Sequence, residues 1–391
     1  MNGLARVRRS RNRRRVVAVV AGLAAALSAA LLALPYGQPG NAEKPSAGAT
    51  PRNSRAAQPA PKRTPPNVYS AVTTSRVERT VSDLPERVYV PNSDAGTLDV
   101  IDPRRLRVVD RFVVGAMPHH VTPSWDMKRL YVTNTVGNSL TVIDPRRARP
   151  AKTVPVEDPY NLYFTPDGSK AVVVAERLQR LDVRDPHSWR LLRSIPVPWL
   201  GVDHLDFSAD GRYAVASCEF SGVVAKVDLR RMRVAGVARV GGLPVDVKLS
   251  ADGRRFYVAN QGRGGVSVID PRRMKEVAFL PTGAGAHGLA VSRDARSLYV
   301  SNRLAGSISV IDLRRRRVRT TWQVGGSPDM LQLSPSGHRL WASSRFDAGV
   351  LVISTRTGRL VKRIPVGSGA HGLSYVPQPG RFSLGHNGVY R

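Results

Sequence analysis

The sequence predicts an all-β fold, a seven-bladed β-propeller built from four-stranded antiparallel blades. Three observations lead to this prediction. A small or polar residue closes a strand-like run seven times at a constant spacing of 42 residues, about four such runs fit into each period, and no helical pattern interrupts them. A period near 40 residues is typical of propellers, because one blade alone cannot bury its apolar faces. The closing residues are Asn92, Asn134, Glu176, Cys218, Asn260, Asn302 and Ser344.

The strands within one period can be assigned from the copy that begins at Pro118. Apolar and β-branched runs predict strands over 120–124, 130–134, 140–144 and 151–156. The first turn usually carries Asp-Gly, whose glycine supplies the positive φ of a tight hairpin, although Asp126-Met127 and Asp294-Ala295 depart from this pattern. The third turn is Asp-Pro-Arg-Arg or a relative, which is ordinary turn chemistry.

The ends of the repeat predict how the ring closes. The repeat occupies residues 86–377, where the first copy starts at its second strand (87–90) and the last piece is a lone first strand (371–376). We therefore expect the C-terminal strand to become the innermost strand of the N-terminal blade, which leaves no open sheet edge between the first and last blades.

The residues outside the repeat have a different composition. Residues 1–15 are rich in arginine, residues 16–34 are uncharged and apolar, residues 35–85 are a Pro/Ala-rich linker, and residues 378–391 form a tail that adds a strand or lies loose. The apolar run predicts a signal peptide or a transmembrane anchor helix that sends the rest of the chain outward. Both alternatives stay open, because the run is long enough to span a bilayer and is followed by small residues at Gly40-Asn41-Ala42. The linker is expected to be disordered. The predicted location is the cell surface or the extracellular space.

The chain is strongly basic, with 60 Lys+Arg against 29 Asp+Glu and a formal charge of +31. Because the Arg-containing turns all emerge on one face of a propeller, they predict a basic ring that could hold an anionic wall polymer, lipid or nucleic acid. The alternative is that these are solvated turns in an arginine-rich protein. The candidate residues are Arg104, Arg105, Arg146, Arg147, Arg230, Arg231, Arg272, Arg273, Arg314 and Arg315.

Three copies of one motif carry a resemblance to a known family. Tyr131-Val132-Thr133-Asn134, Tyr257-Val258-Ala259-Asn260 and Tyr299-Val300-Ser301-Asn302 are each followed by a Val/Ile-x-Val-Ile-Asp strand. The chain thus resembles the YVTN family of β-propeller repeat proteins, over about three quarters of its length. The resemblance implies an exported or surface-attached propeller and leaves the chemistry open, since fold does not fix function.

Histidines and aspartates recur where the innermost strands begin. The repeat register places His287, Asp329, His371 and His119 on four consecutive blades, as a continuous arc at the mouth of the central channel, and His120, Asp203, His204 and Asp246 lie in the same or the next position of their copies. These eight residues are the candidate ligand-binding residues.

The arc of His119, His287, Asp329 and His371 has the side chains that bind a divalent transition metal, or that supply a general base near neutral pH. The alternative is a structural role, in which each histidine bonds a neighbouring loop. A divalent metal is the one cofactor that the sequence indicates. Asn92, Asn134, Asn260 and Asn302 are expected to cap their loops, and Cys218 to be a small buried thiol.

Several enzyme classes lose support. The sequence has no Gly-rich phosphate loop, no nucleophile elbow, no His-Glu-x-x-His helix and only one cysteine. The leading hypothesis is a non-enzymatic, exported scaffold that binds a small ligand or a protein partner at the channel mouth. The alternatives are a metal-dependent enzyme, such as a lyase or an oxidoreductase accessory, and a protein that binds nucleic acid or wall polymer through its arginines.

Overall fold

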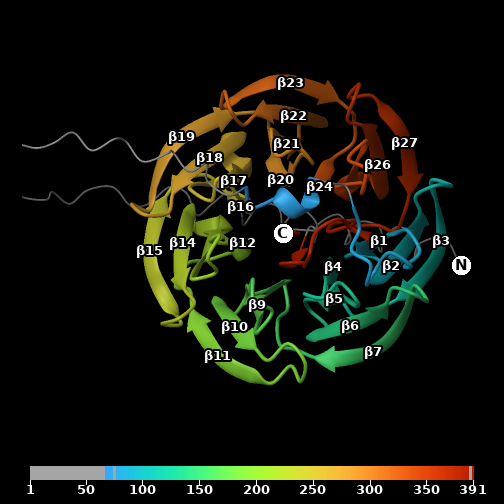
Figure 1. The fold of residues 1–391 in the computed structure, drawn as a ribbon, viewed down its shortest axis with the longest axis horizontal. Helices are drawn as coiled ribbons and strands as arrows, with labels where there is room; N and C mark the ends of the chain where they lie inside the picture. Colours follow the sequence, from blue (N-terminus) through green and yellow to red (C-terminus); the bar gives the residue numbers. More distant parts are fainter. Residues whose placement is uncertain (1–66, 74–75, 387–389) are drawn as a thin grey trace, which may run out of the picture. The chain divides into compact units, whose positions relative to one another are not determined.

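Seven four-stranded antiparallel sheets form a closed ring in the computed structural model, which describes residues 67–73, 76–386 and 390–391 (Figure 1). Each sheet is one blade, and its four strands follow one another outward from the central channel. The predicted all-β, seven-bladed propeller is therefore confirmed. The described C-terminus lies at the centre of the ring.

The strands of the first four blades follow the predicted period. Blade 1 holds β28 (Ser374–Val376), β1 (Arg87–Asn92), β2 (Thr97–Asp102) and β3 (Arg107–Val113). Blade 2 holds β4 (Pro118–Pro123), β5 (Leu130–Asn134), β6 (Ser139–Asp144) and β7 (Arg149–Pro155). Blade 3 holds β8 (Asn161–Phe164), β9 (Ala171–Ala175), β10 (Arg180–Arg184) and β11 (Leu191–Pro196). Blade 4 holds β12 (Val202–Phe207), β13 (Tyr213–Cys218), β14 (Val223–Asp228) and β15 (Arg233–Arg239).

The other three blades repeat the same order. Blade 5 holds β16 (Pro244–Leu249), β17 (Phe256–Asn260), β18 (Gly265–Asp270) and β19 (Lys275–Pro281). Blade 6 holds β20 (Ala286–Val291), β21 (Ser297–Asn302), β22 (Ser307–Asp312) and β23 (Arg317–Gln323). Blade 7 holds β24 (Pro328–Leu333), β25 (Arg339–Ser344), β26 (Gly349–Ser354) and β27 (Leu360–Pro365).

The ring closes in the predicted way, through the C-terminal strand. β28 pairs antiparallel with β1, and Tyr375 lies opposite Val88. The strand is shorter than expected: it begins at Ser374, while Ala370 makes only an isolated bridge with Asn92. Behind this junction, Val88 and Ile101 of blade 1 pack in one core cluster with Trp341 and Val350 of blade 7. The closure therefore rests on side-chain packing as well as on strand pairing.

The turn between the first and second strands of a blade tolerates Asp126-Met127 and Asp294-Ala295 in place of Asp-Gly. Gly168, Gly211 and Gly253 have positive φ, as the hairpin requires, and Met127 and Ala295 adopt the same left-handed conformation at φ 60° and 54°. In each turn a serine or threonine side chain bonds the turn aspartate, for example Ser124 Oγ to Asp126 Oδ1 at 2.6 Å. The side-chain bond helps to hold the turn where glycine is absent.

Segments at both ends of the described chain pack against the ring. The 3-10 helix η1 (Ser70–Val72) and the residues up to Leu84 bury Tyr69, Val72, Val81 and Leu84 against the ring, although 35–85 was predicted to be a linker. The tail buries Leu384 and Tyr390. Both segments carry apolar side chains outside the repeat, so the 42-residue pattern could not indicate where they pack.

Most of the predicted export and linker segments (1–15, 16–34 and 35–66) lie outside the described residues. Within the described residues, no helix has the length and apolar character needed to span a bilayer.

Candidate metal centre in the channel

A repeated irregularity of the innermost strands turns pairs of consecutive residues toward the channel. The pairing of β4 with β5 shifts register between Pro118 and Val121, and the same shift occurs in β12, β16, β20 and β24. His119 and His120 occupy the irregular segment of β4. Because a bulge breaks the strict alternation of side chains, both histidines can approach the channel instead of pointing to opposite faces.

A hydroxyl group replaces the missing ladder bond at four of these irregularities. The backbone N–H of His120 donates to Thr133 Oγ1 at 3.0 Å, and that of His204 donates to Ser217 Oγ at 3.1 Å. Gly288 and Met330 make the same bond to Ser301 and Ser343. The Ser or Thr that precedes the strand-closing position thus fixes the backbone of the histidine-bearing segment.

The predicted arc is continuous, and Asp329 stands at its centre. Asp329 Oδ2 lies 2.6 Å from His371 Nδ1, and Asp329 Oδ1 lies 2.8 Å from His287 Nδ1. Arg303 donates from Nη2 and Nε to Asp329 Oδ1 at 2.5 and 3.1 Å. Burial by itself would raise the pKa of Asp329, but Arg303 and the two histidines hold it well below its usual range. Asp329 is therefore an ionised carboxylate whose oxygens contact Arg303 and two histidines of the arc.

Two histidines of the arc and the neighbouring His120 have ring nitrogens that lie close together. Donor atoms of His119, His120 and His371 all lie within 4.8 Å of one another, and the three side chains are buried. The ring centroids of His119 and His371 are 4.4 Å apart, and those of His120 and His371 are 4.7 Å apart. His119 Nδ1, both nitrogens of His120, and His371 Nε2 have no hydrogen-bond partner. We call these three residues the first triad.

The environment keeps the first triad neutral. Burial lowers the pKa values of His119 and His120 well below the ordinary value, and neighbouring histidines add to the effect. Burial lowers the pKa of His371 to about 3, although Asp329 opposes the shift. Neutral imidazole is the form that binds metals. In His371 the bond to Asp329 keeps the ring proton on Nδ1 and leaves the lone pair of Nε2 available.

The spacing of the first triad is close to what one ion requires. Two nitrogens that each lie about 2.1 Å from a shared ion can be no more than about 4.2 Å apart, and the triad nitrogens lie within 4.8 Å of one another. Small rotations of the three side chains would bring any wider pair into this range.

Asp203, His204 and Asp246 take different positions. Asp203 Oδ1 lies 2.5 Å from His204 Nδ1, without the alignment of a hydrogen bond. Burial opposes protonation of His204, but Asp203 outweighs it and raises the pKa. Asp246 accepts from Lys248 Nζ at 2.9 Å and from the N–H groups of Val247 and Leu289. Asp246 therefore holds neighbouring strands together through both of its oxygens.

His386 belongs to the same cluster and was missed in the sequence. It comes from the tail, outside the 42-residue register, and its ring centroid lies 3.8 Å from that of His120 and 4.8 Å from that of His204. Six of the eight histidines of the chain therefore meet in the channel. The only signal that the sequence offered was one histidine in a segment without a repeat.

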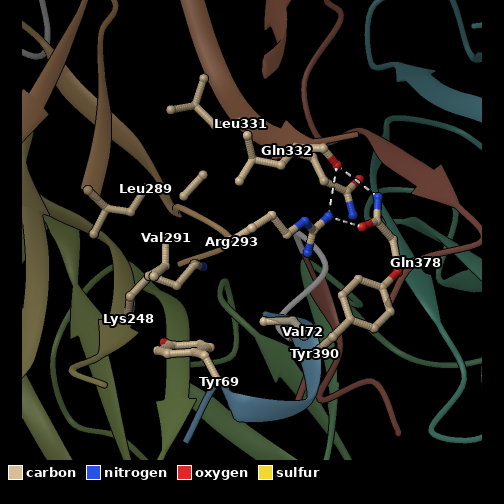
Figure 2. A pocket seen from close by; sticks show the side chains of 12 residues that line it. Tyr69, Val72, Lys248, Leu289, Val291, Arg293, Leu331, Gln332, Gln378 and Tyr390 are labelled. Carbon is tan, nitrogen blue, oxygen red and sulfur yellow. Dashed lines mark hydrogen bonds between the residues drawn. The ribbon is translucent and has the colours of Figure 1, made fainter. Parts of the chain in front are cut away.

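The end of the channel behind the histidines is filled by the terminal segments. Figure 2 shows Arg293, Gln332, Gln378 and Tyr390 around a cavity of about 50 Å³, with Tyr69 on the opposite wall. Arg293 donates to Gln378 Oε1 and to Ser334 O, and Gln378 Nε2 donates to Leu333 O at 2.9 Å. A cavity of this size has room for a few waters and for little else.

The two faces of the ring differ in chemistry. The β-turns that contain the predicted arginines emerge on the face covered by the terminal segments, and Arg104 and Arg147 are each 82% exposed. Some of these arginines are paired, as Arg146 is with Asp83. The loops at the opposite end expose apolar side chains at positions separated by 42 or 84 residues, namely Val136, Leu178, Phe220, Leu304 and Phe346.

The other residues singled out in the sequence have structural positions. Asn134 donates to Ser139 and Thr141, and Asn260 accepts from the N–H groups of Leu243 and Arg263, so these asparagines cap their loops as predicted. Cys218 is fully buried and unpaired. Burial raises the pKa of its thiol to about 12, with a contribution from Asp203.

Comparison with known proteins identifies one family and several solved structures of similar fold. A family model described as a YNCE-like beta-propeller matches residues 65–379. The chain is similar to Kuenenia stuttgartiensis hydrazine synthase (19% identity over 64% of this chain and 87% of that chain, TM-score 0.57). It is also similar to the dihydro-heme d1 dehydrogenase NirN in complex with DHE (17% identity, 77% of each chain, TM-score 0.59). A third structure, a functionally unknown protein from Desulfotomaculum acetoxidans, shares 15% identity over 75% of this chain and 99% of that chain, with a TM-score of 0.65.

No curated protein matches the chain. At these identities the solved structures are evidence for the fold alone.

Proposed function

Because the chain belongs to the YNCE-like β-propeller family, whose fold does not dictate a chemistry, we propose its function from the channel itself: it is a binding propeller that holds a divalent transition-metal ion. The ligands are His119, His120 and His371, and Asp329 orients His371 from behind. The small ligand that the sequence predicts at the channel mouth is, in this proposal, a metal ion. It rests on one observation, the convergence of buried ring nitrogens that have no hydrogen-bond partner.

The unpartnered nitrogens are the main argument for an ion. A buried polar group without a partner costs about 1–3 kcal/mol, and the first triad contains four such atoms: His119 Nδ1, His120 Nδ1, His120 Nε2 and His371 Nε2. A structural role, the alternative raised by the sequence, would satisfy these atoms through neighbouring loops. A bound ion would satisfy one nitrogen of each histidine at once, which supports the proposal.

The donor set favours particular metals. Three neutral imidazoles suit Zn²⁺, Cu²⁺ and Ni²⁺ better than the hard ions Ca²⁺ and Mg²⁺, which prefer oxygen ligands. The carboxylate behind His371 is the second-shell group that commonly supports a metal-bound histidine. Since Asp329 already accepts from Arg303, the proposal assigns it no place in the first shell.

Binding is favoured over catalysis by the closure of the site. His119, His120 and His371 are at most 5% exposed, and the terminal segments fill the channel behind them. A metal ion is small enough to reach the histidines from the mouth of the channel. An organic substrate would have to displace side chains. The metal-dependent lyase or oxidoreductase accessory therefore remains the second candidate.

The arginine face supports an orientation relative to the cell envelope. Val68, near the start of the described chain, donates its N–H to Ala251 O in a turn on the arginine face. Val68 therefore contacts the ring on that face. If residues 16–34 anchor an exported protein, this connection and the exposed arginines both favour an anionic lipid or wall polymer on that side, with the histidine mouth turned away.

Titration of the full chain with Zn²⁺ against a competing chelator tests the proposal. We expect the wild type to retain Zn²⁺, and His371→Ala and His120→Ala to lose at least tenfold in affinity. His338→Ala, which removes an exposed histidine outside the cluster, is the matched control and should behave as the wild type does. If the folded wild type retained none of Zn²⁺, Cu²⁺ and Ni²⁺, the metal site would be excluded. The histidines of the channel would then have a structural role.

A further inference from the structure

A second group of three histidines lies beside the first. Donor atoms of His120, His204 and His386 all lie within 4.8 Å of one another, and the three side chains are 0%, 0% and 1% exposed. The centroids of His120 and His204 are 5.2 Å apart, and His386 lies nearer to each of them. We call this group the second triad. It shares His120 with the first triad.

None of the six ring nitrogens in the second triad has a hydrogen-bond partner. The three side chains come from two innermost strands and the tail, so the fold brings them together from separate parts of the chain. Polar atoms that are buried this deeply are normally paired. A single ion at the first triad would leave His204 Nε2 and both ring nitrogens of His386 without partners, so one ion does not account for the whole cluster.

Each triad has a carboxylate behind one of its histidines. Asp329 lies 2.6 Å from His371 in the first triad, and Asp203 lies 2.5 Å from His204 in the second. Both Asp203 oxygens lack a hydrogen bond, and the side chain is 1% exposed. The two triads therefore repeat one arrangement, in which a buried carboxylate stands behind a histidine that faces other histidines.

The tail holds His386 in place through contacts on both sides. Leu384 O accepts from the N–H of Phe164 at 3.0 Å, and Gly385 forms a bridge with Tyr163. Gly385 has a φ of 128°, and a Cβ there would lie 2.6 Å from Leu162 O, so this close approach requires glycine. At the end of the chain, Arg391 Nη2 donates to Asp206 Oδ1 at 2.7 Å. His386 is thus delivered to the channel by a segment that is anchored to blades 3 and 4.

We propose that His120, His204 and His386 bind a second divalent transition-metal ion, and that His120 bridges the two ions through its two ring nitrogens. The proposal rests on the proposed function, since it adds a second ion to the same channel. Bridging requires that the neutral His120 ring releases its remaining ring proton to solvent as the second ion binds. The resulting imidazolate would carry one negative charge between the ions and, together with Asp203, would offset part of their repulsion.

Equilibrium dialysis of the full chain against Zn²⁺, followed by elemental analysis, tests the second site. We expect two equivalents of Zn²⁺ in the wild type, one in His386→Ala and one in His371→Ala, and two in the control His338→Ala. His386→Gln provides a variant of similar size if alanine loosens the tail, and circular dichroism verifies that each variant is folded. One equivalent in the wild type that His386→Ala does not change would overturn the second site and leave the proposed function intact, whereas no zinc at all would overturn both.

Electron paramagnetic resonance of the protein loaded with two equivalents of Cu²⁺ tests the shared ligand. Two ions bridged by one imidazolate are magnetically coupled, so the signal should be weaker than that of two isolated Cu²⁺ ions. His120→Ala should abolish the coupling, and the control His338→Ala should preserve it. Two equivalents of Cu²⁺ with the full signal of isolated ions would contradict bridging by His120.

Discussion

Asp329 and His371 lie 42 residues apart in the sequence and meet across the junction of blades 7 and 1, where Asp329 Oδ2 is 2.6 Å from His371 Nδ1. His371 is held there by the closing segment, since its N–H donates to Pro91 O at 3.2 Å. The closure of the ring and the geometry of the candidate metal centre therefore depend on the same residues.

Asp329→Asn should weaken metal binding by about 10–100-fold, because the loss of a second-shell carboxylate makes the histidine a poorer ligand. The change also leaves the guanidinium of Arg303, which is mostly buried, without its partner, and breaking such a pair costs about 3–5 kcal/mol. Chelator competition measures the affinity, and thermal unfolding measures the stability. Asp312→Asn, in an exposed turn, is the control, and an unchanged zinc affinity in Asp329→Asn would mean that Asp329 does not orient a ligand.

Gly372→Ala should disturb His120 directly. A Cβ at this position would lie 2.5 Å from His120 Nδ1 and 2.9 Å from His119 O, so the two histidines would have to move. We expect a loss of stability of about 1–3 kcal/mol, as for other overpacked sites, together with weaker zinc binding. Gly349→Ala is the matched control, because its nearest neighbour would be 3.6 Å away. Equal affinities in the two variants would show that the position of His120 does not matter for binding.

Glu176 should make the protein less stable as the pH rises. Burial, together with Asp203 and Glu219, raises the pKa of Glu176 to about 8. Between the unfolded value of about 4.3 and 8, the folded state keeps a proton that the unfolded state has lost, so the free energy of unfolding falls across this window. Glu176→Gln removes the titration.

Thermal unfolding between pH 5 and pH 9 measures this effect. The melting temperature of Glu176→Gln should fall less than that of the wild type, and the exposed control Glu78→Gln should follow the wild type. A wild type and a Glu176→Gln variant with parallel pH profiles would contradict the assignment of a protonated Glu176.

The arginine face should bind anionic surfaces electrostatically. We expect Arg104→Gln/Arg147→Gln to weaken binding to vesicles that contain anionic lipid by about 1 kcal/mol per residue at low salt, and added salt to reduce the difference. Arg239→Gln/Arg363→Gln removes two exposed arginines near the opposite face and is the control. Equal losses in the two double variants would mean that net charge matters and the face does not.

The 42-residue period was enough to predict the ring, its closure and the order of the arc. Each of these depends on residues that share one register, and a propeller places the same register position at the same height in every blade. His287, Asp329, His371 and His119 are neighbours for that reason.

The remaining features depend on contacts that the period does not encode. Asp329 and Asp246 have the residue type of metal ligands, but Arg303 and Lys248 each bond one of their oxygens. His386 lies in a tail without a repeat, so only the folded chain could bring it to His120. The burial of Tyr69 and Leu84 against the ring was hidden in the same way within a segment of linker-like composition.

X-ray absorption spectroscopy of the full-length protein loaded with one equivalent of Zn²⁺ tests the central claim most directly. A zinc ion in the first triad should have at least three nitrogen neighbours at about 2.0–2.1 Å, with the outer-shell scattering of imidazole rings, and His371→Ala should lower the number of imidazoles. A shell of oxygen atoms without imidazole scattering would contradict a histidine metal centre in the channel.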